Sequence, residues 1–329
     1  MSTAPHHLGR SALRRGSILF GWTWAALLAA CGGGGDEAAP VSQGPQPIVA
    51  TSVEAEEQAA YTLLRDERSR CGFGAPSPNS LLAQAARNHA NWLVTNDANS
   101  HEETPGTPGF TGKTALERLQ YVGYPVRAVA ESIGWGSVAP VANGVAVRAL
   151  RGLMAVPYHA IGVVAFNLPE VGLALGPSDG YYAPLVVELA GPQGAAAGPV
   201  VYPPNPVKTY PCEGTTGVLT RTLAENPNPI PGRDLSTNPT GSSIIVSVAS
   251  GNTLTLGAGT LVHVASGQTV EVLPPVTASN DPNRHLAPNT GFYLPAQPLA
   301  PNSRYQFTFR GSNAGVPFTQ SFTYTTGSD

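Results

Sequence analysis

Charged side chains are scarce in this chain of 329 residues, and Asp, Glu, Lys and Arg together make up only 12% of it. The apolar stretch from Ile18 to Ala30 is too short for a transmembrane helix. There are only three cysteines, and their spacing excludes a structural zinc cluster. No repeat or coiled-coil pattern is present. Instead there are 37 glycines and 32 prolines, which is typical of an exported protein rich in turns.

The start of the chain has the pattern of an export signal. Arg10, Arg14 and Arg15 precede the apolar stretch, and small residues end it at Leu28-Ala29-Ala30-Cys31. Because a cysteine stands at the cleavage point, the pattern resembles a bacterial lipobox. The alternative is an ordinary signal with a chance cysteine. We therefore predict a signal peptide at 1–30 and lipidation at Cys31, with the membrane as a partner. Gly32 is not the aspartate that favours inner-membrane retention, so we expect attachment to the outer membrane, on its periplasmic or surface face.

The mature chain is acidic. Loss of the three signal arginines leaves 15 basic and 21 acidic residues, a net charge of −6, with no basic stripe. This balance argues against nucleic acid as a partner. The predicted anchor is therefore the lipid and not a polybasic patch.

Two cysteines remain after lipidation, Cys71 and Cys212. In an oxidising compartment they are expected to form a disulfide. Closing so long a loop is worth about 4 kcal/mol in the chain-entropy model. The alternative is two separate buried thiols.

The sequence pattern of the first part of the chain predicts helices followed by strands. Residues 31–50, rich in Gly, Pro and Ala, predict a flexible tether. Helical patterns come next. One begins at Glu54, one after a predicted cap at Asn79 or Ser80, one after the capping box Thr114–Glu117, and the last runs from about Pro140 to Met154. Strand-like runs come next, at Gly162–Phe166, Val171–Leu175 and Tyr182–Leu189. This order predicts an α+β domain over 51–190.

The second part shows no helical period. Residues 191–225 are rich in Pro and Gly and predict a linker. The range 226–329 contains short alternating runs separated by turn residues, which predicts an all-β sandwich. Its aromatic last strands resemble those of bacterial immunoglobulin-like domains. The runs are Ile244–Val248, Thr253–Leu256, Leu261–Val264, Val270–Leu273, Tyr305–Phe309 and Phe318–Tyr324.

Four places in the first domain could carry chemistry: His101, Glu131, His159 and the segment Gly176-Pro177-Ser178-Asp179-Gly180. The last matches the G-x-S-x-G pattern of serine hydrolases. That pattern requires a strand that turns into a helix, whereas here it lies between two strand-like runs. We therefore predict a hairpin turn there.

The three other residues lie in motifs that resemble a known family. Arg65–Gly72, Asn79–Asn91, His101, Ala130–Ile133 and Leu153–His159 are similar, in order and spacing, to the bacterial branch of the CAP superfamily, which includes cysteine-rich secretory proteins and pathogenesis-related 1 proteins. The resemblance covers residues 54–190. It implies an α-β-α sandwich whose cleft gathers His101, Glu131 and His159.

The chain departs from the family pattern at several positions. Ser132 replaces an asparagine, Leu153 a tryptophan and Ala160 an arginine. No acidic residue stands on the helix before His159, and Glu102 or Glu103 could take its place. His89, which also matches a family position, is expected to be a core residue.

Two imidazoles and a carboxylate are competent ligands for Zn²⁺. The resemblance therefore implies a ligand-binding cleft in which His101 and His159 could hold zinc. We predict a non-enzymatic exported protein that binds a lipid or another component of the cell envelope. The alternatives are a metal-dependent hydrolase or peptidase, a structural surface protein that acts through its β-sandwich, and a cleft in which the three residues only form a buried hydrogen-bonded network.

Overall fold

The structure is a computed structural model, and it describes residues 52–138, 143–192, 206–222 and 224–328. The predicted signal peptide, the lipidation site Cys31 and the whole of the predicted tether lie outside these ranges. None of the helices in the described ranges has the length and apolar character needed to cross a bilayer.

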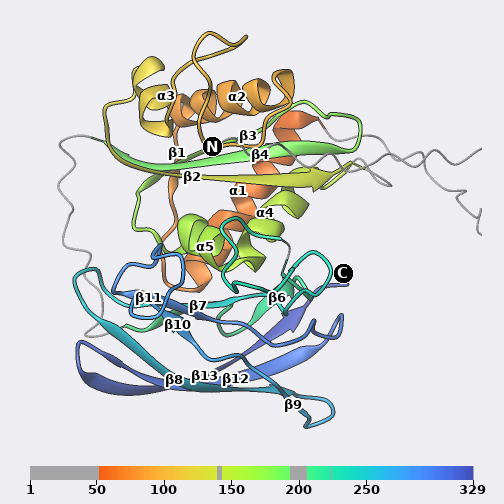
Figure 1. Cartoon of the computed structure of the whole chain (residues 1–329), viewed down its shortest axis with the longest axis vertical. Coiled ribbons are helices and arrows are strands. Elements are labelled where there is room, and N and C mark those ends of the chain that lie inside the picture. The colour runs from red at the N-terminus through yellow and green to blue at the C-terminus, as the bar shows by residue number, and fades with distance from the viewer. Residues whose placement is uncertain (1–51, 139–142, 193–205, 223, 329) are drawn as a thin grey trace, which may run out of the picture. The chain divides into compact units, whose positions relative to one another are not determined.

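A four-stranded sheet forms the centre of the first part (Figure 1). Its strand order is β1-β3-β4-β2, with β1 parallel to β3 and the other pairs antiparallel. Helices α2 and α3 lie on one face of the sheet, and α1, α4 and α5 lie on the other (Figure 1). The helices are α1 (Val53–Arg70), α2 (Ser80–Thr95), α3 (Ala115–Tyr121), α4 (Val145–Ala155) and α5 (Pro157–Ala160), and the strands are β1 (Ser77–Pro78), β2 (Val126–Ser137), β3 (Glu170–Leu175) and β4 (Tyr182–Pro192).

Local sequence signals account for where the helices start. The side chain of Asn79 accepts hydrogen bonds from the first backbone N–H groups of α2, as predicted. Thr114 and Glu117 form the predicted capping box at α3. Gly144, at φ +76°, stands before α4, and the expected start of this helix near Pro140 lies outside the described residues.

The second part consists of two further sheets. One has the order β10-β11-β7-β5 and the other β6-β13-β12-β8-β9. An aromatic core fills the space between them, with Tyr293 from the first sheet against Phe307 and Phe309 from the second. The strands are β5 (Lys208–Tyr210), β6 (Thr215–Val218), β7 (Ile244–Ser247), β8 (Leu254–His263), β9 (Thr269–Val270), β10 (Val276–Thr277), β11 (Thr290–Tyr293), β12 (Arg304–Asn313) and β13 (Val316–Thr326).

Strand β7 joins the cores of the two parts because both of its faces are buried. Ile244 and Val246 point into the aromatic core, whereas Ile245 packs into the core of the first part. Phe292 of β11 also packs there. The described residues accordingly form one compact unit.

Several elements differ from the sequence expectation. Gly162–Phe166, predicted as a strand, is instead a π-helical turn at Ile161–Ala165, and a short buried apolar run fits either structure. Strand β2 was not expected, because its alanines, glycines and serines carry no strand signal. The predicted linker contains β5 and β6. The two runs Thr253–Leu256 and Leu261–Val264 form the single strand β8, in which Gly259 leaves room for the Phe307 ring.

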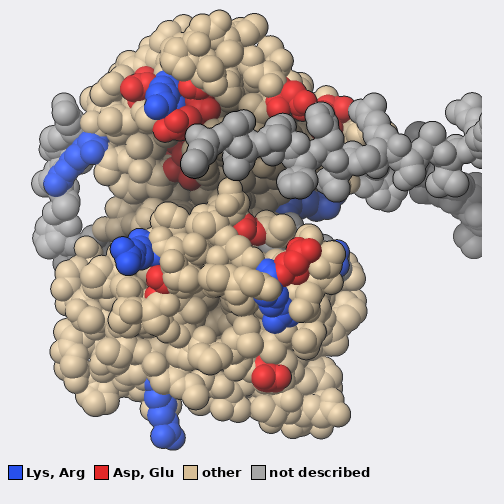
Figure 2. All heavy atoms as spheres, in the orientation of Figure 1, with Lys and Arg blue, Asp and Glu red and all other residues tan. Residues whose placement is uncertain are grey.

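The predicted disulfide between Cys71 and Cys212 is confirmed. It joins the end of α1 to the segment between β5 and β6, across 141 positions of the sequence. The face drawn in Figure 2 carries few charged side chains, and the acidic ones gather mainly on the part that holds the helices.

Candidate functional site

His101 and His159 lie on the same cleft, although 58 positions separate them in the sequence. Their ring centroids are 6.5 Å apart, and the cleft has a volume of about 270 Å³. The His101 side chain is 55% exposed and that of His159 is 20% exposed. Apolar groups form much of the remaining wall, namely Ile133, Ala149, Leu153, Val156 and Ala224.

Two glycines of β2 allow α4 to pack closely against this strand, and both elements line the cleft. A side chain at Gly134 would come within 2.9 Å of the Ala149 carbonyl oxygen, and one at Gly136 would clash with the Val145 backbone. Close approach of the helix to the strand therefore requires both glycines. The close packing places Leu153 of α4 beside Gly134 at the base of the cleft.

Glu131 of β2 holds the ring of His101. Its Oε1 lies 2.8 Å from His101 Nδ1, and its Oε2 accepts a hydrogen bond from the guanidinium of Arg118. Both Glu131 and Arg118 are buried. Burial opposes ionisation of Glu131, but the hydrogen bond from His101 and the positive charges of Arg118 and His89 outweigh it and lower its pKa to about 2. Glu131 is thus a carboxylate that orients His101.

A second buried layer supports this contact. His89 Nδ1 lies 3.0 Å from Glu103 Oε1, and His89 Nε2 lies 3.1 Å from the carbonyl oxygen of Ser100. Both partners lie in the buried layer behind Glu131. Arg118 also donates to the carbonyl oxygen of His101, at 3.2 Å. His89 and Arg118 therefore fix the loop that carries His101.

Glu188 of β4 lies directly opposite Glu131 in the sheet and is fully buried. Neither of its carboxyl oxygens has a hydrogen-bond partner of normal geometry among the described residues. Burial and the negative charge of Glu131 raise the pKa of Glu188 well above its usual range. Glu188 is therefore a neutral acid beside an ionised one, and this arrangement avoids two adjacent buried negative charges.

Replacing Glu188 by glutamine is expected to change how stability depends on pH. Above about pH 4.5 the unfolded chain loses the Glu188 proton while the folded chain keeps it. The wild type should thus lose about 1.4 kcal/mol per pH unit relative to Glu188→Gln, until the pH reaches the raised pKa. Urea unfolding between pH 5 and 8 measures this slope, with the exposed Glu102→Gln as the control. A constant difference at every pH would contradict the neutral state of Glu188.

His159 is held from the second part of the chain. Its Nδ1 lies 2.9 Å from Glu225 Oε1, which also accepts a hydrogen bond from the His159 backbone N–H at 3.0 Å. The Glu225 side chain is fully buried. The neighbouring Tyr158 donates a hydrogen bond to Asp281 and accepts one from Asn283. Side chains from both parts of the chain thus position the two cleft histidines.

The Nε2 atoms of the two cleft histidines are the groups that could hold a metal ion of the zinc type. Each ring uses Nδ1 to contact a carboxylate, and neither Nε2 has a partner among the described residues. Carboxylate contacts of this kind orient histidines that bind metals through the other nitrogen. The described residues contain no group of three or more His, Cys, Asp or Glu side chains placed around one metal position. His101 and His159 would thus supply two ligands, and water or a bound ligand would complete the coordination.

The structure places the other sequence candidates away from this cleft. Gly176–Gly180 forms the turn between the antiparallel strands β3 and β4, as predicted, where Asp179 accepts hydrogen bonds from two backbone N–H groups. Glu103 is buried in the network around Arg118, and Glu102 is exposed and pairs with Lys113.

Three residues of the site were not expected from the sequence, namely Arg118, Glu188 and Glu225. Glu188 stands in an otherwise apolar run, Val187-Glu188-Leu189, and a lone charge in such a position is a usable signal. Arg118 gives no such signal, because it directly follows Glu117. Glu225 has no local signal, because its contact with His159 spans 66 positions.

Comparison with known proteins leaves the family of the chain open. No protein-family model and no curated protein matches it. An outer surface protein of Borrelia burgdorferi is similar in structure, with 13% identity and a TM-score of 0.37, over 44% of this chain and 97% of that one. An extracellular protein of Bacillus anthracis that contains an SCP domain shows 20% identity and a TM-score of 0.34, over 42% of this chain and 41% of its own.

Proposed function

We propose that this chain is an exported binding protein of the CAP type, whose histidine cleft takes a small ligand together with a divalent metal ion such as Zn²⁺. His101 and His159 are the proposed metal ligands, and Glu131 is the brace of the first. The α-β-α order of the first part and the motifs around these three residues support the assignment. A cleft of about 270 Å³ suits a small molecule or the headgroup of a cell-envelope lipid.

The observation that carries the proposal is the matched environment of the two histidines. Both rings contact a buried carboxylate through Nδ1, Glu131 for His101 and Glu225 for His159, and both line one cleft. A bound metal ion would act there as a Lewis acid and orient an oxygen-bearing ligand. The protein itself orients the two rings and provides the partly apolar wall beside them.

The remaining parts of the proposal concern where the protein acts. A lipid on Cys31 would attach it to the outer membrane, and residues 31–50 would form the tether. The second part would serve as a spacer of the immunoglobulin-like type. The N-terminal sequence pattern and the two packed sheets support these assignments.

A calorimetric titration with zinc tests the proposal. We expect the wild-type protein to bind one zinc ion and His101→Ala/His159→Ala to lose this binding. The control is His263→Ala, which removes a histidine whose ring contacts Ser266 in the second part. Equal binding by the wild type and the double variant would refute the metal site. The cluster around Glu131 would then have only a structural role.

Replacing Glu225 by glutamine should weaken zinc binding without removing a ligand. The amide can no longer provide the negative charge that orients and polarises the His159 ring. The loss of such a partner typically lowers metal affinity 10- to 100-fold. The same titration measures the effect, and Glu213→Gln, an exposed acid of the second part, is the control. An unchanged dissociation constant would contradict the role of Glu225.

A further inference from the structure

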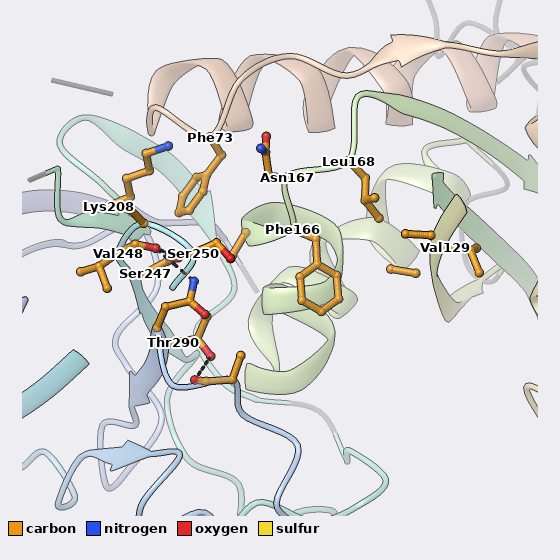
Figure 3. Close-up of a pocket in the computed structure, with 16 residues that line it drawn as sticks. Phe73, Val129, Phe166, Asn167, Leu168, Lys208, Ser247, Val248, Ser250 and Thr290 are labelled. Carbon is orange, nitrogen blue, oxygen red and sulfur yellow. Dashed lines mark hydrogen bonds between the residues drawn. The ribbon is translucent and has the colours of Figure 1, made fainter. Parts of the chain in front are cut away.

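A second and larger cavity lies apart from the histidine cleft. It has a volume of about 690 Å³ and shares no lining residue with that cleft. Its walls come from both parts of the chain (Figure 3). They are Phe73 after α1, residues 128–130 near the start of β2, residues 165–168 at the end of the π-helical turn and beyond it, Lys208 of β5, residues 247–250 at the end of β7 and beyond it, and three residues of the segment 287–290 before and in β11.

The lining of this cavity is mainly apolar. Figure 3 shows Phe73 on one side, Leu168 and Val129 on the other, and Phe166 between them. Phe166 is 41% exposed, which is unusual for so large an apolar side chain. A cavity of this size falls within the range of ordinary ligand sites, whose walls are also mostly apolar. The apolar body of a ligand would cover the exposed Phe166 ring.

One charged side chain is present among the sixteen residues that line the cavity, and it is Lys208. No acidic residue lines it. The whole chain contains only two lysines, Lys113 and Lys208, and its formal net charge is negative. The one charged side chain in the lining is therefore positive, in a chain whose net charge is negative.

A buried arginine adds positive charge behind the wall. Arg68 is almost fully buried and donates hydrogen bonds to the carbonyl oxygens of Phe73, at 3.4 Å, and Phe166, at 2.9 Å. One guanidinium thus holds the backbone at both of these aromatic residues. The Lys208 ammonium group lies 5.6 Å from the centre of the Phe73 ring. Burial and the charge of Arg68 lower the pKa of Lys208 to about 8, so the amine remains mostly protonated at neutral pH.

The cavity also offers polar groups and a rigid frame. The amide of Asn167 and the hydroxyl of Ser250 have no hydrogen-bond partner among the described residues, so both are available to a ligand. The Cys71–Cys212 disulfide stands two positions before Phe73 and four after Lys208, and it ties these walls together. A pre-formed site of this kind loses little conformational entropy when it binds.

We propose that this cavity binds a single-chain amphiphile with an apolar body and a carboxylate head. The apolar body lies against Phe73, Phe166 and Leu168, and the carboxylate lies at Lys208. The inference is independent of the proposed histidine site, because the two cavities have no lining residue in common.

Three probes with the same ten-carbon chain test the proposal: decanoate, decanol and decyltrimethylammonium. We expect decanoate to bind the full protein one to one at neutral pH, at least tenfold more tightly than decanol, and the cation not to bind. Lys208→Met should lower the affinity for decanoate to that for decanol and leave the affinity for decanol unchanged. Lys208→Arg should retain preference for the anion, and Lys113→Met is the matched control.

A cavity-filling variant completes the test. Ala249→Trp, at a partly exposed position of the lining, should abolish binding of decanoate and of decanol while leaving zinc binding unchanged. Circular dichroism establishes that each variant folds. Equal binding of all three probes, or decanoate binding that survives both Lys208→Met and Ala249→Trp, would overturn the proposal. Zinc binding by the histidine variant tests only the histidine cleft, so either proposal can be refuted while the other stands.

Discussion

Replacing Arg118 by methionine is expected to lower the free energy of unfolding by about 3–5 kcal/mol. Arg118 is fully buried and donates to Glu131, which is also buried. Removing the guanidinium would leave the carboxylate of Glu131 without its strongest countercharge and next to Glu188. Removing one partner of a buried ion pair lowers the stability of the fold by far more than the intact pair adds to it. The reason is that the other charge then stays unpaired in a medium of low polarity. Urea unfolding at neutral pH measures the loss.

The matched control is Arg65→Met. Arg65 pairs with Asp66 at 2.7 Å, but both side chains are more than 40% exposed. An exposed pair contributes less than about 1 kcal/mol. The double variant Arg118→Met/Glu131→Gln should recover much of the loss, because no unpaired charge then remains. If Arg118→Met lost no more stability than Arg65→Met, the buried charge pair of Arg118 and Glu131 would not stabilise the fold.

Loss of the Cys71–Cys212 disulfide is expected to have an effect of similar size. The bond closes a loop of about 140 residues, which corresponds to about 4–5 kcal/mol in the chain-entropy model. The loop includes the whole sheet of the first part and both cleft histidines. Cys71→Ala/Cys212→Ala should therefore unfold at a much lower urea concentration than the oxidised wild type.

Reduction of the wild type separates the effect of the bond from that of the side chains. The reduced wild type should be nearly as unstable as the double variant, and a reducing agent should not change the stability of the double variant. A difference of less than about 1 kcal/mol between oxidised and reduced wild type would contradict a role of the disulfide in stability.

Motif spacing predicted part of the site. His101, Glu131 and His159 were identified because each matches a position of the family motifs, and the structure places the two histidines on one cleft. The partners of these residues could not be predicted in the same way. Glu225 reaches His159 from the segment that was expected to be a linker, and Pro and Gly content gives no sign of such a contact.

Strand β2 shows why the fold was predicted only in part. Helices with caps and an apolar face were recognised, because their signals are local. Strand β2 instead depends on pairing with β4 and on the two glycines that allow α4 to approach. Neither the pairing nor the close approach has a signal in the sequence of β2 itself. The element that carries Glu131 was therefore not predicted, although Glu131 was.

Locating zinc in crystals of the protein, by anomalous scattering at the zinc absorption edge, would test the proposed metal cleft at atomic detail. We predict a single strong peak within bonding distance of Nε2 of His101 and Nε2 of His159, with Glu131 and Glu225 still at Nδ1 of the two rings. A peak elsewhere, or no peak at the two rings after soaking with zinc, would contradict the proposed metal cleft.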